Sequence, residues 1–132
     1  VFSSTDIAFS PSWISYAELQ FTPWTGTDIR FMNKTVSQQY MDNTASAEKS
    51  IPLYNVSNIS ISHLLKSNKK IGEWTFNLLL NNIFNSDFVS RGYTYHRGHT
   101  VSNTGHVTRG RDYNFFFPQA RFNFMVGVGW KI

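Results

Sequence analysis

Residues 121–132 read RFNFMVGVGWKI and show the strictest alternation of side-chain character in the chain. Every second position is apolar: Phe122, Phe124, Val126, Val128, Trp130 and Ile132. The intervening positions are mostly polar or small: Arg121, Asn123, Met125, Gly127, Gly129 and Lys131. Because successive side chains of a β-strand point to opposite faces, the pattern predicts a strand with one apolar face and one polar or small face.

The same period of two recurs in residues 73–84. The even-numbered positions hold the apolar residues Trp74, Phe76, Leu78 and Leu80. The odd-numbered positions hold the polar residues Thr75, Asn77 and Asn81, and Leu79 is the exception. Weaker alternation predicts three further strands. The five predicted strands cover about residues 7–21, 27–40, 51–65, 73–84 and 117–132. The sequence therefore predicts an all-β, antiparallel chain with two longer loops, at 41–50 and 85–116.

The apolar alternation continues to the last residue of this sequence, whereas the termini of soluble domains are usually polar and exposed. A transmembrane β-barrel strand has this pattern, with its apolar face toward lipid and its other face toward the lumen. No apolar run reaches the ~18 residues of a spanning helix. Aromatic residues make up 17% of the chain, and cysteine is absent, which excludes disulfides and cysteine metal sites. We therefore predict a segment of an outer-membrane barrel.

That orientation assigns the side chains of the two clearest strands to two surfaces. The residues predicted to face lipid are Trp74, Phe76, Leu78, Leu80, Phe122, Phe124, Val126, Val128 and Trp130. The residues predicted to face the lumen are Asn77, Asn81, Arg121, Asn123 and Lys131. These lumen residues are expected to line water or brace a plug rather than to select a ligand.

Five strands cannot close a barrel alone. Such a sheet leaves two edges whose backbone groups would be unpaired in hydrocarbon. Bacterial barrels made from a single chain also have an even number of strands. The chain is therefore expected to be part of a barrel, with the missing strands on another segment.

Several stretches resemble, in order, the carboxyl-terminal part of a TonB-dependent outer-membrane receptor, especially of the Bacteroidetes type. They are Phe9-Ser10-Pro11-Ser12-Trp13, Gln39-Tyr40-Met41-Asp42-Asn43-Thr44, Asn81-Asn82-Ile83-Phe84-Asn85, Arg91-Gly92-Tyr93-Thr94-Tyr95 and Phe116-Phe117-Pro118-Gln119-Ala120-Arg121-Phe122-Asn123-Phe124. The resemblance covers nearly the whole chain. It departs at Ile132, where such barrels usually end in an aromatic residue.

The resemblance implies that the chain supplies about five carboxyl-terminal strands of a 22-stranded, plugged barrel in the outer membrane of a Gram-negative bacterium. It implies active import of a scarce nutrient, such as siderophore-bound iron or a similar small ligand, with energy from TonB. The implied partners are the remainder of the receptor with its plug, TonB through an absent amino-terminal part, and outer-membrane lipid or lipopolysaccharide. A surface lipoprotein is left open as a further partner. No cofactor, enzymatic activity or nucleic-acid partner is expected.

The predicted loop 85–116 is rich in basic side chains that are candidates for ligand binding. These are Arg91, His96, Arg97, His99, His106, Arg109 and Arg111, against the two acids Asp87 and Asp112. A cationic rim of this kind attracts anionic ligands. A solvated loop, or one that binds lipopolysaccharide phosphates, is the simpler interpretation. The loop histidines are expected to lack a carboxylate partner, and no metal site is predicted.

Two other classes of protein remain open. In a soluble β-sandwich, such as a lectin-like binding module, the apolar faces would meet in a dry core. In a small barrel built from several copies of the chain, the open edges would pair with each other. An enzyme is not predicted, because there are no paired carboxylates, no phosphate loop and no nucleophile in a recognisable setting.

Overall fold

The computed structural model describes residues 6–66, 72–98, 100–101, 103–104, 107–108 and 110–131. The described chain is all-β, with antiparallel strand pairs and a single short 3-10 helix, η1 (Ala47–Lys49). It divides into two compact units. We call Ile14–Val36, Asn55–Phe88 and Ala120–Ile132 the sheet unit, and Val1–Trp13, Ser37–Tyr54 and Val89–Gln119 the hairpin unit.

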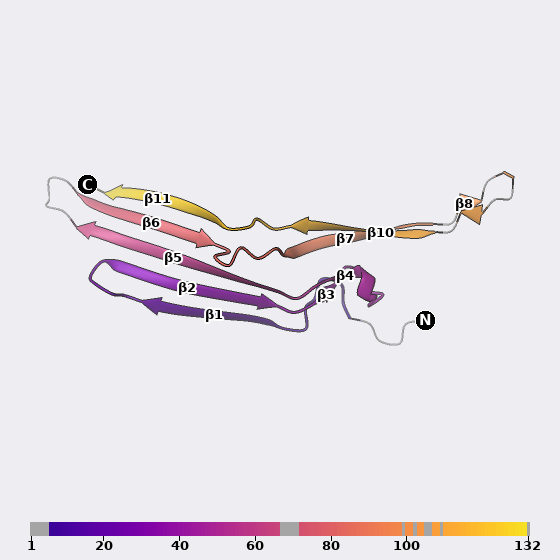
Figure 1. Ribbon diagram of the computed structural model, residues 1–132, viewed down its shortest axis with the longest axis horizontal. Coiled ribbons are helices and arrows are strands. Elements are labelled where there is room, and N and C mark those ends of the chain that lie inside the picture. The colour runs from indigo at the N-terminus through magenta and orange to yellow at the C-terminus, as the bar shows by residue number, and fades with distance from the viewer. Residues whose placement is uncertain are drawn as a thin grey trace. The chain divides into compact units, whose positions relative to one another are not determined.

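The sheet unit is a five-stranded sheet in which the strands follow each other in the order of the sequence (Figure 1). From one edge to the other, the strands are β1 (Ile14–Phe21), β2 (Thr27–Val36), β5 (Tyr54–Lys66), β6 (Glu73–Asn81) and β11 (Asn123–Lys131). The sheet is open, because β1 and β11 each have a neighbour on one side only.

The strand register puts the apolar side chains of β5, β6 and β11 on one face. Val126 lies opposite Leu78, which in turn lies opposite Ile61, and Trp130 lies opposite Trp74. The rings of the two tryptophans stack with their centroids 5.6 Å apart. Directly opposed residues of an antiparallel pair share a face. The alternation of β6 and that of β11 therefore combine into one continuous apolar surface, which we call the apolar face.

The apolar face continues through β2 to β1. The Thr27 Oγ1 and His63 Nδ1 atoms lie 2.7 Å apart, and the Asn33 side chain donates to Ser57 Oγ at 2.7 Å, so the odd-numbered residues of β2 and β5 share this face. In the adjoining pair, Phe31 lies opposite Leu19, and Ile29 lies opposite Phe21. The opposite face of the sheet carries mainly polar and charged residues, such as Glu18, Gln20, Asp28, Arg30, Ser60, Ser62, Thr75 and Asn77.

The five sheet strands occupy the five predicted regions, but each differs from its predicted bounds. β1 begins at Ile14 rather than at residue 7, β2 ends at Val36, and β5 begins at Tyr54. β6 ends at Asn81 because Asn82 and Asn85 adopt positive φ angles of 50° and 53° and start a turn. Asparagine tolerates this left-handed conformation better than most residues do. β11 begins at Asn123, since residues up to Pro118 belong to another strand.

The prediction of a loop over 85–116 is wrong in part, because this stretch contains most of a long β-hairpin. β7 (Val89–Arg97) pairs with β10 (Arg111–Pro118), with Tyr95 opposite Tyr113 and Tyr93 opposite Phe115. Tyrosine, phenylalanine and threonine all favour strands. They are interspersed here with arginine, histidine and asparagine, so apolar residues do not recur at every second position and their periodicity does not indicate the two strands.

The rest of the hairpin unit consists of short elements. β3 (Gln39–Tyr40) pairs with β4 (Ser50–Ile51), and η1 comes directly before β4; the second predicted loop, 41–50, joins this pair. β8 (Thr100–Val101) pairs with β9 (Val107–Thr108). The side chain of Asn114 donates to the Glu48 carbonyl at 2.8 Å, which ties β10 to η1.

Buried apolar side chains are few. Among the described residues, the buried hydrophobic side chains are Val36, Met41 and Ile51. Met41 lies against the backbone of Gly92, where a Cβ atom would come within 2.7 Å of the Met41 sulfur and of the Phe115 carbonyl oxygen. The close approach of β7 to β10 and to Met41 therefore requires a glycine at this position.

We predict that Gly92→Ala destabilises the hairpin unit by about 1–3 kcal/mol, the usual cost of overpacking. The matched control is Gly98→Ala, at the end of the same hairpin strand, where an added Cβ meets nothing within 4 Å. Hydrogen-exchange protection of the β7 and β10 amides measures the difference. Equal protection in the two variants would contradict the packing described for Gly92.

Candidate functional site

The apolar face of the sheet unit is exposed on the two edge strands, β1 and β11, and half-buried over much of β2, β5 and β6. Phe124, Val126 and Val128 are 63%, 68% and 59% exposed, although they are among the most hydrophobic residues of the chain. The strand residues predicted to face lipid all lie on this one face by register, and Phe122, which comes just before β11, is also exposed. The face can therefore contact a large apolar surface or solvent.

The residues predicted to face the lumen lie on the opposite face or just outside the strands. Asn81 donates to the Asn123 side chain across β6 and β11 at 3.0 Å. Asn77 lies opposite Gly127, and Lys131 lies opposite Glu73. Arg121 lies before β11 and makes two hydrogen bonds to the Asp87 carboxylate, at 2.6 and 2.7 Å.

An asparagine-centred turn closes the end of β6. The buried Asn82 side chain accepts from the Ser86 N–H at 3.0 Å and donates to the Ser86 carbonyl at 2.8 Å. It also donates to the Ala120 carbonyl at 3.3 Å, and the Asn82 N–H donates to the Asn58 side chain at 2.9 Å. Buried polar groups are costly when unpaired. This network therefore fixes the backbone of two segments: the one that follows β6 and the one that precedes β11.

One face of the β7–β10 hairpin carries aromatic and basic side chains, and we call it the aromatic face. By register it holds Arg91, Tyr93, Tyr95 and Arg97 of β7 and Arg111, Tyr113, Phe115 and Phe117 of β10. The Tyr93 and Phe115 rings stack at 4.8 Å, and the Arg111 guanidinium lies 5.8 Å from the centre of the Tyr113 ring. Three predicted ligand residues, Arg91, Arg97 and Arg111, are thus brought to one face.

The other predicted basic residues are not on the aromatic face. His96 lies opposite Asp112 on the second face of the hairpin. His99, His106 and Arg109 lie outside the described residues. The aromatic residues that share a face with the arginines were not predicted from the sequence. The spacing of Arg91, Tyr93, Tyr95 and Arg97 does indicate a strand face that mixes basic and aromatic side chains.

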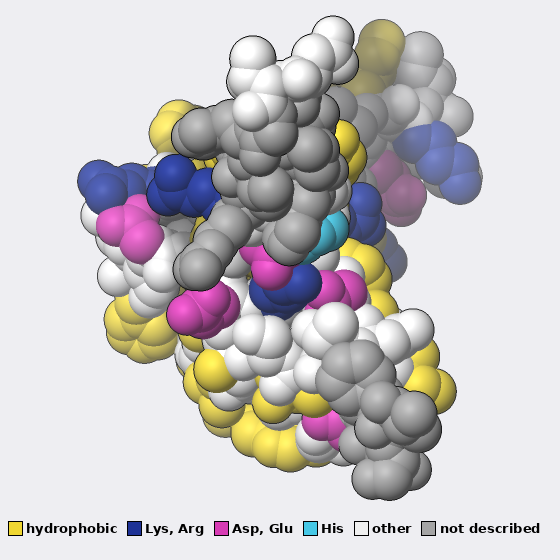
Figure 2. Space-filling model, turned by 90° about the vertical axis from the view of Figure 1, so that its right-hand side faces the viewer, with side chains coloured by type: hydrophobic (Ala, Val, Ile, Leu, Met, Phe, Trp, Pro, Cys, Tyr) yellow, Lys and Arg dark blue, Asp and Glu magenta, His cyan; other side chains and the backbone are white. Residues whose placement is uncertain are grey.

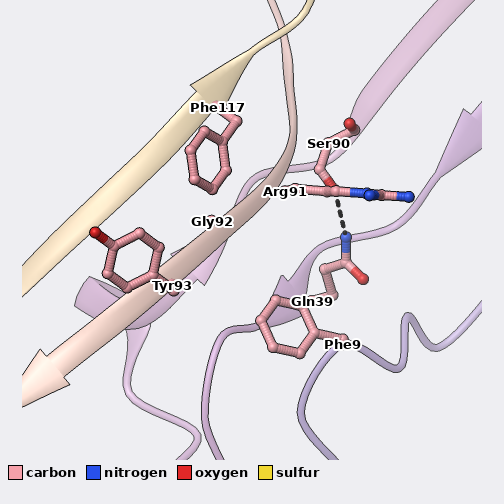
Figure 3. Close-up of a pocket in the computed structure, with 7 residues that line it drawn as sticks. All are labelled: Phe9, Gln39, Ser90, Arg91, Gly92, Tyr93 and Phe117. Carbon is pink, nitrogen blue, oxygen red and sulfur yellow. Dashed lines mark hydrogen bonds between the residues drawn. The ribbon is translucent and has the colours of Figure 1, made fainter.

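A pocket opens at the base of the hairpin, within the hairpin unit (Figure 3). Its volume is about 460 Å³. It is lined by Phe9, Gln39, Ser90, Arg91, Gly92, Tyr93 and Phe117. Figure 3 shows the Tyr93 and Phe117 rings on one side, the Phe9 ring apart from them, and the extended Arg91 side chain near Gln39. The Gln39 side chain donates to the Ser90 carbonyl at 3.5 Å.

A charged cluster occupies the second face of the hairpin. The Lys49 ammonium lies 2.9 Å from Asp42 and 3.1 Å from Asp112, and Asp112 accepts a contact of 2.6 Å from His96 Nδ1. The expectation that the loop histidines lack a carboxylate partner is therefore wrong for His96. Figure 2 shows basic, acidic and histidine side chains gathered on the face that it presents.

The cluster shifts the titration of its members. Hydrogen bonds from His96 and Lys49 lower the pKa of Asp112 below its ordinary 3.8. Hydrogen bonds to Asp42 and Asp112 raise the pKa of Lys49 above its ordinary 10.5. The carboxylate contribution to stability is complete above pH 3.8 and disappears as the pH falls through the lowered pKa. The lysine contribution is complete below pH 10.5 and disappears as the pH rises through the raised pKa.

We predict that Asp112→Asn lowers the protection of the β7 and β10 amides while Asp112 is ionised, and that the difference from the unsubstituted protein closes as the pH falls through the lowered pKa of Asp112. Hydrogen exchange between pH 2 and 7 checks this. Asp6→Asn is the control, because Asp6 takes part in none of the ion pairs found among the described residues. A gap between Asp112→Asn and the unsubstituted protein that persists at the lowest pH would contradict the ionic role of Asp112.

The described residues show neither a metal-binding cluster nor a membrane-spanning helix. No group of three or more His, Cys, Asp or Glu side chains there is arranged to hold a metal ion. The same residues contain no helix with the length and apolar character of a membrane span.

Comparisons of the chain with protein-family models, with curated proteins and with solved structures give no match.

Proposed function

We propose that the chain forms part of the barrel wall of an outer-membrane receptor of the TonB-dependent type, which imports a scarce nutrient. The observation that carries the proposal is the apolar face, which runs across the sheet unit from β1 to β11 and is most exposed on these two edge strands. In the membrane this face contacts lipid and the polar face lines the interior. On this proposal the protein is a transporter rather than an enzyme.

Strand length supports a membrane role for the sheet. A strand needs about 9–11 residues to cross the hydrocarbon core. β2, β6 and β11 contain 10, 9 and 9 residues, β5 contains 13, and β1 is slightly shorter, with 8. Trp74 and Trp130, stacked near one end of the sheet, suit an interfacial aromatic belt.

The exposure of the apolar face argues against the soluble β-sandwich. A sandwich buries its inner faces against a second sheet. Here Phe124, Val126 and Val128 remain largely exposed, and the buried hydrophobic residues in the described part of the chain are Val36, Met41 and Ile51. A contiguous exposed apolar surface usually marks contact with a membrane or a partner.

The two open edges favour part of a barrel over a complete one. The edge groups of β1 and β11 need strand partners in hydrocarbon, and the remainder of the receptor supplies them. The order of the strands also sends both long connections, residues 37–53 and 82–122, to one end of the sheet. In outer-membrane barrels the longer connections are extracellular. On this rule residues 41–50 and 85–116 belong to extracellular connections, and the plug and the TonB-contacting segment belong to other parts of the receptor.

A matched pair of charge substitutions tests the membrane role. Val126 and Met125 are neighbours in β11 and are 68% and 64% exposed, so arginine at either position is tolerated if both meet water. In a bilayer, we predict that Val126→Arg costs about 2–4 kcal/mol and that Met125→Arg costs little. The measurement is the fraction of the chain that stays in the outer membrane after urea extraction.

Equal retention of the two arginine variants would contradict a lipid-facing β11. The same membrane extract, solubilised in mild detergent, separates the two barrel arrangements. A copurifying polypeptide with a plug domain supports the receptor. A folded, membrane-inserted assembly that holds copies of this chain alone contradicts it and favours the small multi-chain barrel.

A further inference from the structure

The pocket of the hairpin unit has features that a barrel wall does not require. Three aromatic side chains line it, and each is about half exposed: Phe9 at 50%, Tyr93 at 47% and Phe117 at 52%. Its volume of about 460 Å³ lies within the ~300–1,000 Å³ range of small-molecule sites. Aromatic rings grouped around such a space offer stacking and edge contacts to a flat ring.

Arg91 gives the pocket lining a positive charge. None of the ion pairs found among the described residues involves Arg91. Two carboxylates of the hairpin unit are engaged with other cations, since Asp112 contacts His96 and Lys49, and Asp42 contacts Lys49. A guanidinium in this setting favours a carboxylate or a similar anion, to which it donates two parallel hydrogen bonds.

Phe9 is held in the pocket wall in a conformation that is unfavourable for an aromatic residue. Its φ angle is +57°, in the left-handed region. Two hydrogen bonds hold this segment: the Phe9 N–H donates to the Tyr40 carbonyl at 2.8 Å, and the Ala8 N–H donates to the Asn43 side chain at 2.8 Å. Strained residues of this kind gather at ligand sites. Glycine would fit the backbone here without strain, so the ring itself needs another reason to be present.

We propose that this pocket binds a small ligand with a planar aromatic ring and an anionic group. The ring lies among Phe9, Tyr93 and Phe117, and the anion lies at Arg91. We further propose that the receptor takes up solutes of this class. Only this statement about uptake rests on the proposed function. Binding itself depends only on the hairpin unit.

The test is calorimetric titration of the detergent-solubilised protein, together with any polypeptide that accompanies it, using 2-naphthoate and cyclohexanecarboxylate as probes. We expect 2-naphthoate to bind more tightly, because cyclohexanecarboxylate has the charge without the aromatic plane. Arg91→Gln is expected to weaken 2-naphthoate about tenfold, as the loss of one charge-assisted interaction does. Arg97→Gln is the matched control, since Arg97 has the same charge, strand and face but does not line the pocket.

Phe9→Gly separates a binding role from a structural one. Glycine removes the ring and accepts the positive φ, so we expect unchanged or higher thermal stability together with a severalfold weaker 2-naphthoate affinity. Lower stability with unchanged affinity would assign Phe9 to packing and overturn its part in the site.

Three results would overturn the proposal: no binding of 2-naphthoate, equal binding of the two probes, or equal losses in Arg91→Gln and Arg97→Gln. These outcomes are distinct from a failure of the proposed function, which is read from the retention of Val126→Arg and Met125→Arg in the membrane. If 2-naphthoate binds with the expected variant pattern but the protein does not need the membrane, the ligand site is supported and the proposed transport function is contradicted.

Discussion

The whole sheet unit depends on what covers its apolar face. The register aligns Trp74 with Trp130 and Leu78 with Val126, so the hydrophobic side chains of neighbouring strands cannot avoid forming one surface. A surface of this kind in water carries an unfavourable hydration free energy that grows with its area. Lipid removes that cost without a second protein layer. The open edges impose the companion requirement, because their backbone groups also need partners in hydrocarbon.

The polar interactions of the chain concentrate where strands end. Asn82 satisfies its buried amide with Ser86 and Ala120, and Arg121 holds Asp87 with two hydrogen bonds. In the hairpin unit, Lys49 joins η1 to Asp112 of β10. These contacts fix the long connections locally, while the sheet is held by its ladder. On the two proposals above, the sheet unit forms the wall and the hairpin unit binds the ligand, so a change in the connections can alter the ligand without disturbing the strands.

The sequence predicts the sheet well because a strand pattern is local. The alternation of residues 122–130 and of 74–80 places each side chain on its face before any partner is known. The strand ends were predicted less well. The positive φ of Asn82 stops β6, but the alternation of apolar and polar residues does not show that the strand ends at Asn81. The β7–β10 hairpin was missed because its strand-favouring tyrosines are interspersed with arginine, threonine and histidine, so apolar residues do not recur at every second position. The pocket is lined by Phe9, Arg91 and Phe117, which are far apart in the sequence. No local sequence pattern indicates that they lie close together.

The most direct measurement of the central claim is a spin-label scan of β11 and the residue before it, in lipid bilayers. The chain contains no cysteine, so single cysteines at 122–130 can be labelled without other substitutions. We expect accessibility to molecular oxygen, which concentrates in lipid, to peak at the even positions 122–130, and accessibility to a water-soluble nickel complex to peak at 125, 127 and 129. A uniform profile, or greater nickel access at Phe124, Val126 and Val128, would contradict the contact of this face with lipid.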